Sequence, residues 1–242
     1  MSQLFLTLAG FRVLMDAKYD YIAKQCKDYI ADFSAREADF TVSATEDEIA
    51  RELQQGREQG MTASEGYAES ICLYRNLCKQ LPMRQALLMH AAVISDGTDA
   101  YAFTAPSGTG KSTHIRLWRQ AFGDGIFVIN GDKPILRLIN GTWWAYGTPW
   151  CGKEGWQTNT CKPLAAVCFL TRGKENRIGR VDPTEAVPAL MHQVILPNQP
   201  EAAQASLKLM DHLLTHVPLY RLACNVSTEA AVIAREAMTP DR

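Results

Sequence analysis

One eight-residue stretch of the chain has the composition of a phosphate-binding loop. It reads APSGTGKS over residues 105–112, with alanine in place of the usual first glycine. Gly108 and Gly110 can adopt positive φ and let the backbone close on a ligand. The loop amides and the N-terminus of the following helix then present positive charge to a phosphate. Lys111 would reach the β- and γ-phosphates, and the Ser112 hydroxyl would ligate Mg²⁺.

The residues on either side of this loop give it the context that a nucleotide site requires. Residues 101–104 form a short apolar stretch typical of a strand, and residues 115–118 continue a helix. A glycine-rich turn before a surface helix is the simpler alternative, but the strand–loop–helix order favours nucleotide binding. The residues expected to contact the nucleotide are Ser107, Gly108, Thr109, Gly110, Lys111, Ser112 and Thr113.

Asp132 is the first candidate for a carboxylate in the same site. It follows a buried-looking strand at residues 126–129, downstream of the loop and its helix. A carboxylate in that position holds Mg²⁺ or its water shell in many phosphate-loop enzymes. It could instead act as the general base on an incoming hydroxyl. The alternative is a plain turn aspartate, because Asn130-Gly131 alone makes a good turn.

Three further residues are candidates for catalysis. His90 ends an apolar stretch, and a short turn to the next strand would place it beside the phosphate loop, although a lone histidine is often structural. Lys153 and Glu154 lie in a segment punctuated by glycine and proline, residues 147–154. Such a loop can bring a cation to a transferring phosphate and a carboxylate to a metal or a hydroxyl. A solvated surface turn is the alternative, but two flanking tryptophans are unusual there.

The composition excludes several classes of protein. A length of 242 residues, 47% hydrophobic and 21% charged, is ordinary for a globular chain of one domain or two. The net charge of −1 gives no electrostatic argument for a nucleic acid or a membrane surface as partner. No apolar run approaches a membrane span, and the start lacks the features of a signal peptide. Seven scattered cysteines without a CxxC pair indicate free thiols, so we expect a cytoplasmic protein.

The hydrophobic pattern predicts a small N-terminal α+β region over residues 1–83 and a larger core over residues 84–242. The N-terminal region carries no catalytic motif and is expected to pack on the core or to dock a partner or substrate. Its expected elements are a hairpin at residues 4–14, a strand at 40–42, and helices at 19–29, 46–55 and 63–81. In the core we expect strands at residues 87–94, 101–104, 126–129, 135–139, 142–146, 164–170, 177–181 and 219–222, and late helices at 183–191, 201–216 and 228–238.

The order of these motifs resembles the catalytic domain of HPr kinase/phosphorylase and its relatives. His90 stands on the strand before the loop strand, 21 residues ahead of Lys111, as the family's histidine does. The resemblance covers about residues 86–180 and implies a phosphoenolpyruvate-carboxykinase-like core: a bent mixed α/β sheet with flanking helices. The family carries an Asp-Asp pair where this chain has Gly131-Asp132. Either Asp132 performs both roles, or the chemistry differs.

The leading hypothesis is a kinase that uses ATP and Mg²⁺ to phosphorylate a hydroxyl of a protein, peptide or small metabolite. Ser112 and Asp132 would hold the metal, Asp132 or His90 would take the proton, and Lys153 would stabilise the transferring group. The missing first aspartate motivates an alternative, a nucleotide-binding sensor or adaptor with little turnover. A carboxykinase-type lyase is a weaker alternative, because no convincing set of extra metal ligands is present. The sequence leaves open the phosphoacceptor, ATP or GTP preference, and homo-oligomer formation.

Overall fold

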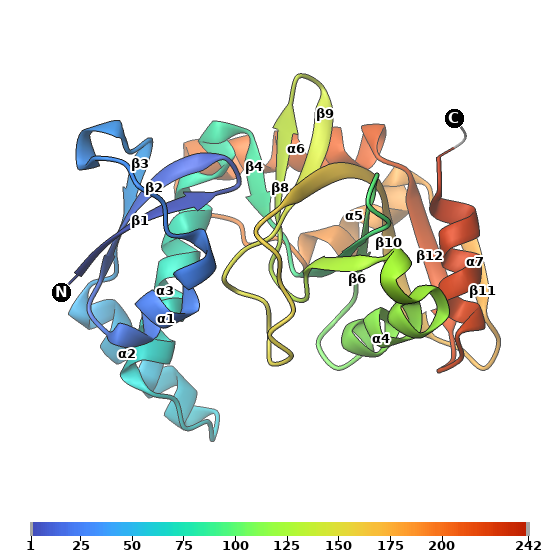
Figure 1. Ribbon diagram of the computed structural model, residues 1–242, viewed down its shortest axis with the longest axis horizontal. Helices are drawn as coiled ribbons and strands as arrows, with labels where there is room; N and C mark the ends of the chain where they lie inside the picture. The colour runs from blue at the N-terminus through green and yellow to red at the C-terminus, as the bar shows by residue number, and fades with distance from the viewer. Residues whose placement is uncertain (1, 241–242) are drawn as a thin grey trace.

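A computed structural model describes residues 2–240 and contains a three-stranded sheet and a nine-stranded sheet (Figure 1). The small sheet has the order β1-β2-β3 and belongs to the N-terminal part of the chain. The large sheet follows the path β4-β8-β9-β10-β6-β5-β7, with β12 paired to β10 and β11 paired to β12. The fold is therefore mixed α/β, as the sequence predicts.

The N-terminal part combines the small sheet with three α-helices, and the expected hairpin and strand are both present. Ala9 and Gly10 turn the hairpin with positive φ of 52° and 76°. A capping box between Thr45 and Glu48 starts α2, as the sequence indicates. The elements are β1 (Ser2–Leu8), β2 (Phe11–Ala17), α1 (Asp20–Gln25), β3 (Phe40–Val42), α2 (Glu46–Glu58) and α3 (Glu65–Gln80).

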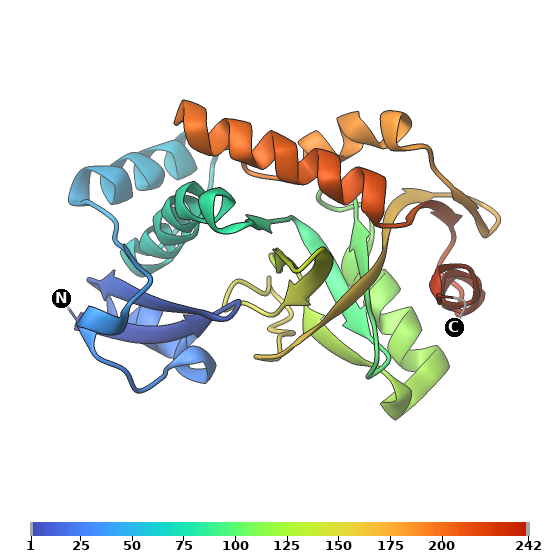
Figure 2. The same ribbon diagram turned by 90° about the horizontal axis from the view of Figure 1, so that it is seen from above.

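The large sheet mixes parallel and antiparallel pairs. The longest strand, β10, pairs in parallel with β6 and β12 and antiparallel with β9. Its pairing shifts between Leu164 and Ala166, where the strand passes from one half of the sheet to the other. Such an irregularity bends a strand, and the sheet curls around β10 (Figures 1 and 2). The strands are β4 (Ala86–Leu88), β5 (Ala91–Ser95), β6 (Ala100–Thr104), β7 (Phe127–Asn130), β8 (Ile135–Ile139), β9 (Thr142–Tyr146), β10 (Cys161–Arg172), β11 (Arg177–Arg180) and β12 (Leu219–Cys224).

Helices cover both faces of the large sheet, which explains its continuous apolar strands. In β5, Ala91 and Val93 join the apolar cluster that contains residues of α5 and α6, whereas Ala92 and Ile94 join the cluster that contains residues of α4 and α7. Side chains alternate between the two faces of a strand, so a strand buried on both sides must be apolar throughout. The helices are α4 (Lys111–Phe122), α5 (Pro183–Met191), α6 (Pro200–His216) and α7 (Glu229–Met238).

The N-terminal part and the core share one hydrophobic cluster. Leu73 and Leu77 of α3 are buried in the same cluster as Leu88, Ile135 and Trp150 of the core. Helix α6 runs along the upper side of the molecule in Figure 2, from the N-terminal part towards the end of the core. The junction near residue 83 is therefore packed rather than open.

Three expected elements differ from the structure. The helix expected at residues 19–29 is divided, because α1 ends at Gln25 and Lys27–Tyr29 form a 3-10 helix. Residues 87–94 do not form one strand, because the chain bends at Met89 and His90 and passes from β4 to β5. The helix expected at residues 46–55 continues through Gly56 to Glu58, and the residue with a positive φ, 73°, is Gly60.

Within residues 2–240, no helix has both the length and the apolar character needed to cross a bilayer.

Candidate functional site

The phosphate-binding motif lies in the turn between β6 and α4. Gly108 and Gly110 have φ of 77° and 127°, a region that other residues rarely adopt. No atom lies within 4 Å of a Cβ built on either glycine, so backbone conformation and not crowding requires glycine there. Ser107 and Gly108 are exposed, whereas Thr109, Ser112 and Thr113 are half-buried. The loop is thus open to solvent in front of the first turn of α4.

The Lys111 side chain is buried inside this turn. Its Nζ donates to the Ala105 carbonyl oxygen at 2.9 Å, so the ammonium is held by the loop itself. Burial lowers the pKa of Lys111, the nearby Asp132 carboxylate opposes this effect, and the positive charge of Lys133 adds to it. An anion bound in the loop would relieve the burial cost by supplying a counter-charge.

A buried asparagine shapes the turn that carries Asp132. The Asn130 Oδ1 accepts hydrogen bonds from the backbone N–H of Asp132 at 2.8 Å and of Lys133 at 2.7 Å. Its Nδ2 donates to the carbonyl oxygen of Thr148 at 3.0 Å. Asn130 therefore holds the backbone of the turn after β7 that carries Asp132, and connects this turn to the loop beginning at Gly147.

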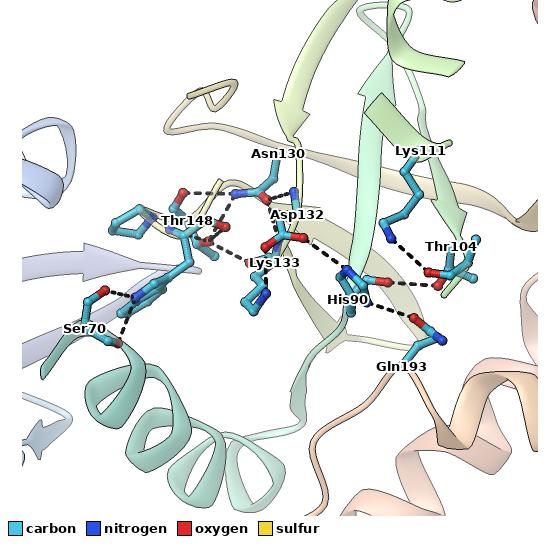
Figure 3. Close-up of polar contacts among 12 residues, drawn as sticks. Ser70, His90, Thr104, Lys111, Asn130, Asp132, Lys133, Thr148 and Gln193 are labelled. Atoms are coloured by element: carbon cyan, nitrogen blue, oxygen red, sulfur yellow. Dashed lines mark hydrogen bonds and ion pairs between the residues drawn. The ribbon is translucent and has the colours of Figure 1, made fainter. Parts of the chain in front are cut away.

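His90 and Asp132 face each other across the bend between β4 and β5. The His90 Nε2 lies 3.2 Å from Asp132 Oδ1, and its Nδ1 lies 3.1 Å from Gln193 Oε1 (Figure 3). The backbone N–H of His90 also donates to the Gln193 carbonyl at 2.7 Å. On the other side, the Thr104 hydroxyl donates to the His90 carbonyl at 2.9 Å. His90 is therefore held next to the end of the loop strand, as the sequence predicts.

Lys133 contacts the second oxygen of the Asp132 carboxylate. Its Nζ lies 2.6 Å from Asp132 Oδ2 and 5.5 Å from the centre of the Tyr74 ring of α3. Burial raises the pKa of Asp132, but the hydrogen bond from His90 and the charge of Lys133 outweigh it and lower that pKa to about 2. Asp132 is therefore ionised at neutral pH and links a histidine to a lysine.

The segment from Gly147 to Trp156 covers the Asp132 turn and explains why position 131 is glycine. A Cβ at Gly131 would lie 2.9 Å from the Cys151 carbonyl oxygen and 3.3 Å from that of Trp156. The Gly131 N–H donates to the Trp156 carbonyl at 2.9 Å. A Cβ built on Gly152, which has φ of 77°, would lie 3.1 Å from Asp132 Cβ. Any side chain at position 131 would therefore force the backbone of this segment to move.

The Asp132 carboxylate contacts His90 and Lys133, whereas Glu154, one of the two candidates of this segment, contacts another residue. Lys153 is exposed on the turn. Glu154 pairs with Arg116 of α4, Oε1 to Nη2 at 2.7 Å. Arg116 and Arg119 also lie over the Trp156 ring, at 5.5 and 5.7 Å from its centre. Glu154 and Trp156 thus attach the segment to the loop helix.

Three contacts of the site involve residues that sequence reasoning did not select: Asn130, Lys133 and Gln193. Arg172 ends β10, and its Nη2 donates to the Gly108 carbonyl at 2.7 Å, which anchors the loop from a neighbouring strand. From its place at the end of a core strand, the sequence offers Arg172 as a possible phosphate or substrate contact, and the structure shows it bound to the loop backbone. Lys133 adjoins Asp132 in the sequence and could have been considered with it. Gln193 gave no signal, because it lies 103 residues from His90.

The residues present fit a magnesium ion bound together with a nucleotide. No group of three or more His, Cys, Asp or Glu side chains among the described residues is arranged to hold a metal. Mg²⁺ typically uses one or two carboxylates together with phosphate oxygens and water. Asp132 and the half-buried Ser112 hydroxyl are the protein ligands that this chain offers.

Comparisons with known proteins give structural likenesses but no sequence relative. No family model and no curated protein matches the chain. Among solved structures, the HPr(Ser) kinase/phosphatase from Coxiella burnetii matches with 10% sequence identity and a TM-score of 0.36. The match covers 62% of this chain and 92% of that one. At that TM-score the two chains overlap too loosely for either fold or activity to be transferred.

Proposed function

We propose that this protein is an ATP- and Mg²⁺-dependent kinase that transfers the γ-phosphoryl group to a hydroxyl of a protein, a peptide or a small metabolite. The observation that carries the proposal is the position of Lys111, electrostatically coupled to a carboxylate that bridges His90 and Lys133. Phosphoryl transfer depends mainly on positioning and charge stabilisation. The site combines phosphate-binding backbone, cations and an ionised carboxylate.

In the proposed reaction, the loop amides of residues 107–111 and the Lys111 ammonium hold the phosphates. Ser112 and Asp132 would hold Mg²⁺, which would supply further charge neutralisation. The acceptor oxygen attacks the γ-phosphorus while the bond to the β–γ bridging oxygen breaks, and ADP leaves with that electron pair. The acceptor proton passes to Asp132, whose orientation His90 maintains. Asp132 is a weak base, which suits a transition state in which the acceptor proton leaves late.

Two other residues have proposed supporting roles. Lys153 would approach the transferring group from its exposed turn if the segment around it closes over the nucleotide. Glu154 would act through Arg116, by holding that segment against α4. Neither role is needed for the arrangement of Lys111, Asp132 and His90.

The test is incubation of the protein with γ-labelled ATP, Mg²⁺ and fractionated cell extract. We expect label on one protein band or metabolite, and a loss of about 100-fold or more in Lys111→Ala and Asp132→Asn. The exposed residues of α6 provide matched controls, Lys208→Ala and Asp211→Asn, which should keep wild-type transfer. Transfer that persists in Asp132→Asn would contradict the assignment of the carboxylate.

A nucleotide-binding sensor or adaptor is the second candidate, favoured by the packing at Gly131. The backbone of residues 151 and 156 fills the space that a second carboxylate would need. Nucleotide binding without transfer or hydrolysis, across all extract fractions, would support this candidate. Recovery of a phosphorylated product would exclude it.

A further inference from the structure

Two lysines and one carboxylate in the candidate site leave an excess of positive charge. Lys133 contacts Asp132, and Asp132 contacts His90. The His90 carbonyl accepts from Thr104, the residue before Ala105, whose carbonyl holds Lys111. Asp132 neutralises one ammonium only. The remaining positive charge, together with the loop amides, favours a group with more negative charge than a single carboxylate.

Each ammonium is held by an acceptor of the protein itself. Lys111 donates to the Ala105 carbonyl at 2.9 Å, and Lys133 donates to Asp132 Oδ2 at 2.6 Å. In Figure 3, Lys133 and His90 flank Asp132, and Lys111 lies beyond His90 next to Thr104. The oxygen atoms of a bound triphosphate are acceptors that could replace these protein acceptors.

The backbone of Lys133 is fixed, and its side chain is partly exposed. Its N–H donates to Asn130 Oδ1 at 2.7 Å and to the Trp150 carbonyl at 3.1 Å, and its carbonyl accepts from the Thr148 hydroxyl at 2.6 Å. The side chain is 20% exposed and lies beside the Tyr74 ring. A lysine is a point charge with three donors on a flexible stem, so it can exchange one anionic partner for another.

We propose that Lys133 is a second phosphate-binding cation, which contacts the terminal phosphate of a bound nucleoside triphosphate. This inference rests on the nucleotide site of the proposed function and assigns specificity for the triphosphate within it. Lys111 serves the phosphates shared by ADP and ATP. Lys133, which approaches from the Asp132 side, serves only the phosphate that ADP lacks. A lysine that merely held Asp132 in place would affect both nucleotides alike.

The experiment compares the affinities of ADP and of the non-hydrolysable analogue AMPPNP by titration calorimetry. In Lys133→Met we expect AMPPNP to bind about tenfold more weakly, because one charge-assisted contact is lost, and ADP to bind within about twofold of wild type. Lys133→Arg keeps the charge and should recover most of the AMPPNP affinity. Lys208→Met, on the exposed face of α6, is the control and should change neither affinity.

The outcomes separate this inference from the proposed kinase activity. Equal weakening of ADP and AMPPNP in Lys133→Met, or no weakening of either, would overturn the inference even if the wild type transfers phosphate. Selective weakening of AMPPNP would support it even if the wild type transfers none, in which case the kinase proposal fails alone. A wild-type protein that binds neither nucleotide would overturn both.

Discussion

Arg172 is the residue that links the phosphate loop to the large sheet. Its guanidinium donates to the Gly108 carbonyl at 2.7 Å from the end of β10. We expect Arg172→Met to release the loop and weaken ADP and AMPPNP equally, by about tenfold, because a charge-assisted hydrogen bond is lost. Calorimetric titration of both nucleotides checks this. Arg177→Met, at a position 79% exposed, is the matched control, and a selective effect on AMPPNP would contradict the anchoring role.

His114 makes the fold sensitive to acid. It is 2% exposed in α4, its Nε2 accepts a hydrogen bond from Trp118 Nε1 at 2.9 Å, and its Nδ1 has no partner among the described residues. Burial lowers the pKa of His114 from 6.5 to about 3. Between those values the unfolded chain binds one proton that the folded chain does not. The stabilising contribution of the neutral ring is therefore complete above pH 6.5 and is lost as the pH falls.

The expected result is a free energy of unfolding that falls on the order of 3 kcal/mol between pH 6.5 and pH 4 through this residue alone. Urea unfolding at several pH values measures it. In His114→Gln the free energy of unfolding should depend less steeply on pH, because one fewer proton binds on unfolding. The exposed His192→Gln is the control for loss of one imidazole. Identical slopes in wild type and His114→Gln would show that the ring is not buried in its neutral form.

Single residues were predictable where the backbone motif determines their place. The glycines and lysine of the loop follow from spacing, and the position of His90 beside Thr104 follows from a short strand–turn–strand connection. Lys133 and Asn130 were not selected, because their importance comes from side-chain contacts made across the fold. The roles proposed for Lys153 and Glu154 stay predictions until activity is measured.

At the scale of elements, the segment from Gly147 to Trp156 depends on the absence of a side chain at position 131. A Cβ there would meet the Cys151 carbonyl oxygen at 2.9 Å. We expect Gly131→Ala to lower the free energy of unfolding by about 1–3 kcal/mol, because crowded backbone must move. Chemical denaturation measures the loss, and transfer or nucleotide binding should fall with it.

Gly125→Ala is the matched control for this substitution. No atom lies within 4 Å of a Cβ at position 125. We expect that variant to unfold at the wild-type denaturant concentration within error. If Gly131→Ala were equally neutral, the close packing of residues 151 and 156 on the Asp132 turn would be wrong.

Elements that are long and periodic were predictable from the sequence, and breaks within apolar runs were not. Helix α3 and the hairpin of β8 and β9 agree closely with the pattern, because apolar spacing and the Asn140-Gly141 turn specify them. The bend at His90 was missed, because residues on both sides of it are equally apolar. The two strands pair with different partners: β4 pairs with β8, whereas β5 pairs with β6 and β7. The local sequence does not determine which strands pair.

At the scale of the whole molecule, the N-terminal part and the core are joined around the site segment. The Trp150 indole N–H donates to the Ser70 hydroxyl at 3.0 Å, and the Tyr29 hydroxyl donates to Gln157 Oε1 at 2.6 Å. On the opposite side of the segment lies the turn of Asp132. The small sheet and its helices therefore help to hold the candidate site, although they carry no motif of their own.

Because the two parts share a hydrophobic cluster, we expect them to unfold in one cooperative transition. Tryptophan fluorescence and far-ultraviolet circular dichroism should give coincident curves in urea. Trp150→Phe removes the hydrogen bond to Ser70 and should shift both curves together, to lower denaturant. Two separate transitions in the wild type would instead mean that the parts fold independently, as a boundary near residue 83 suggests.

The contact between Gly131 and the segment above it also has a consequence for comparing genomes. A side chain at position 131 would meet the backbone of residues 151 and 156. The residue at 131 and the backbone path of residues 150–156 should therefore change together during evolution. Lineages with aspartate at that position should carry an insertion, a deletion or a different glycine pattern downstream. Their joint distribution among homologues of this chain would then test whether the close packing at position 131 constrains the downstream segment.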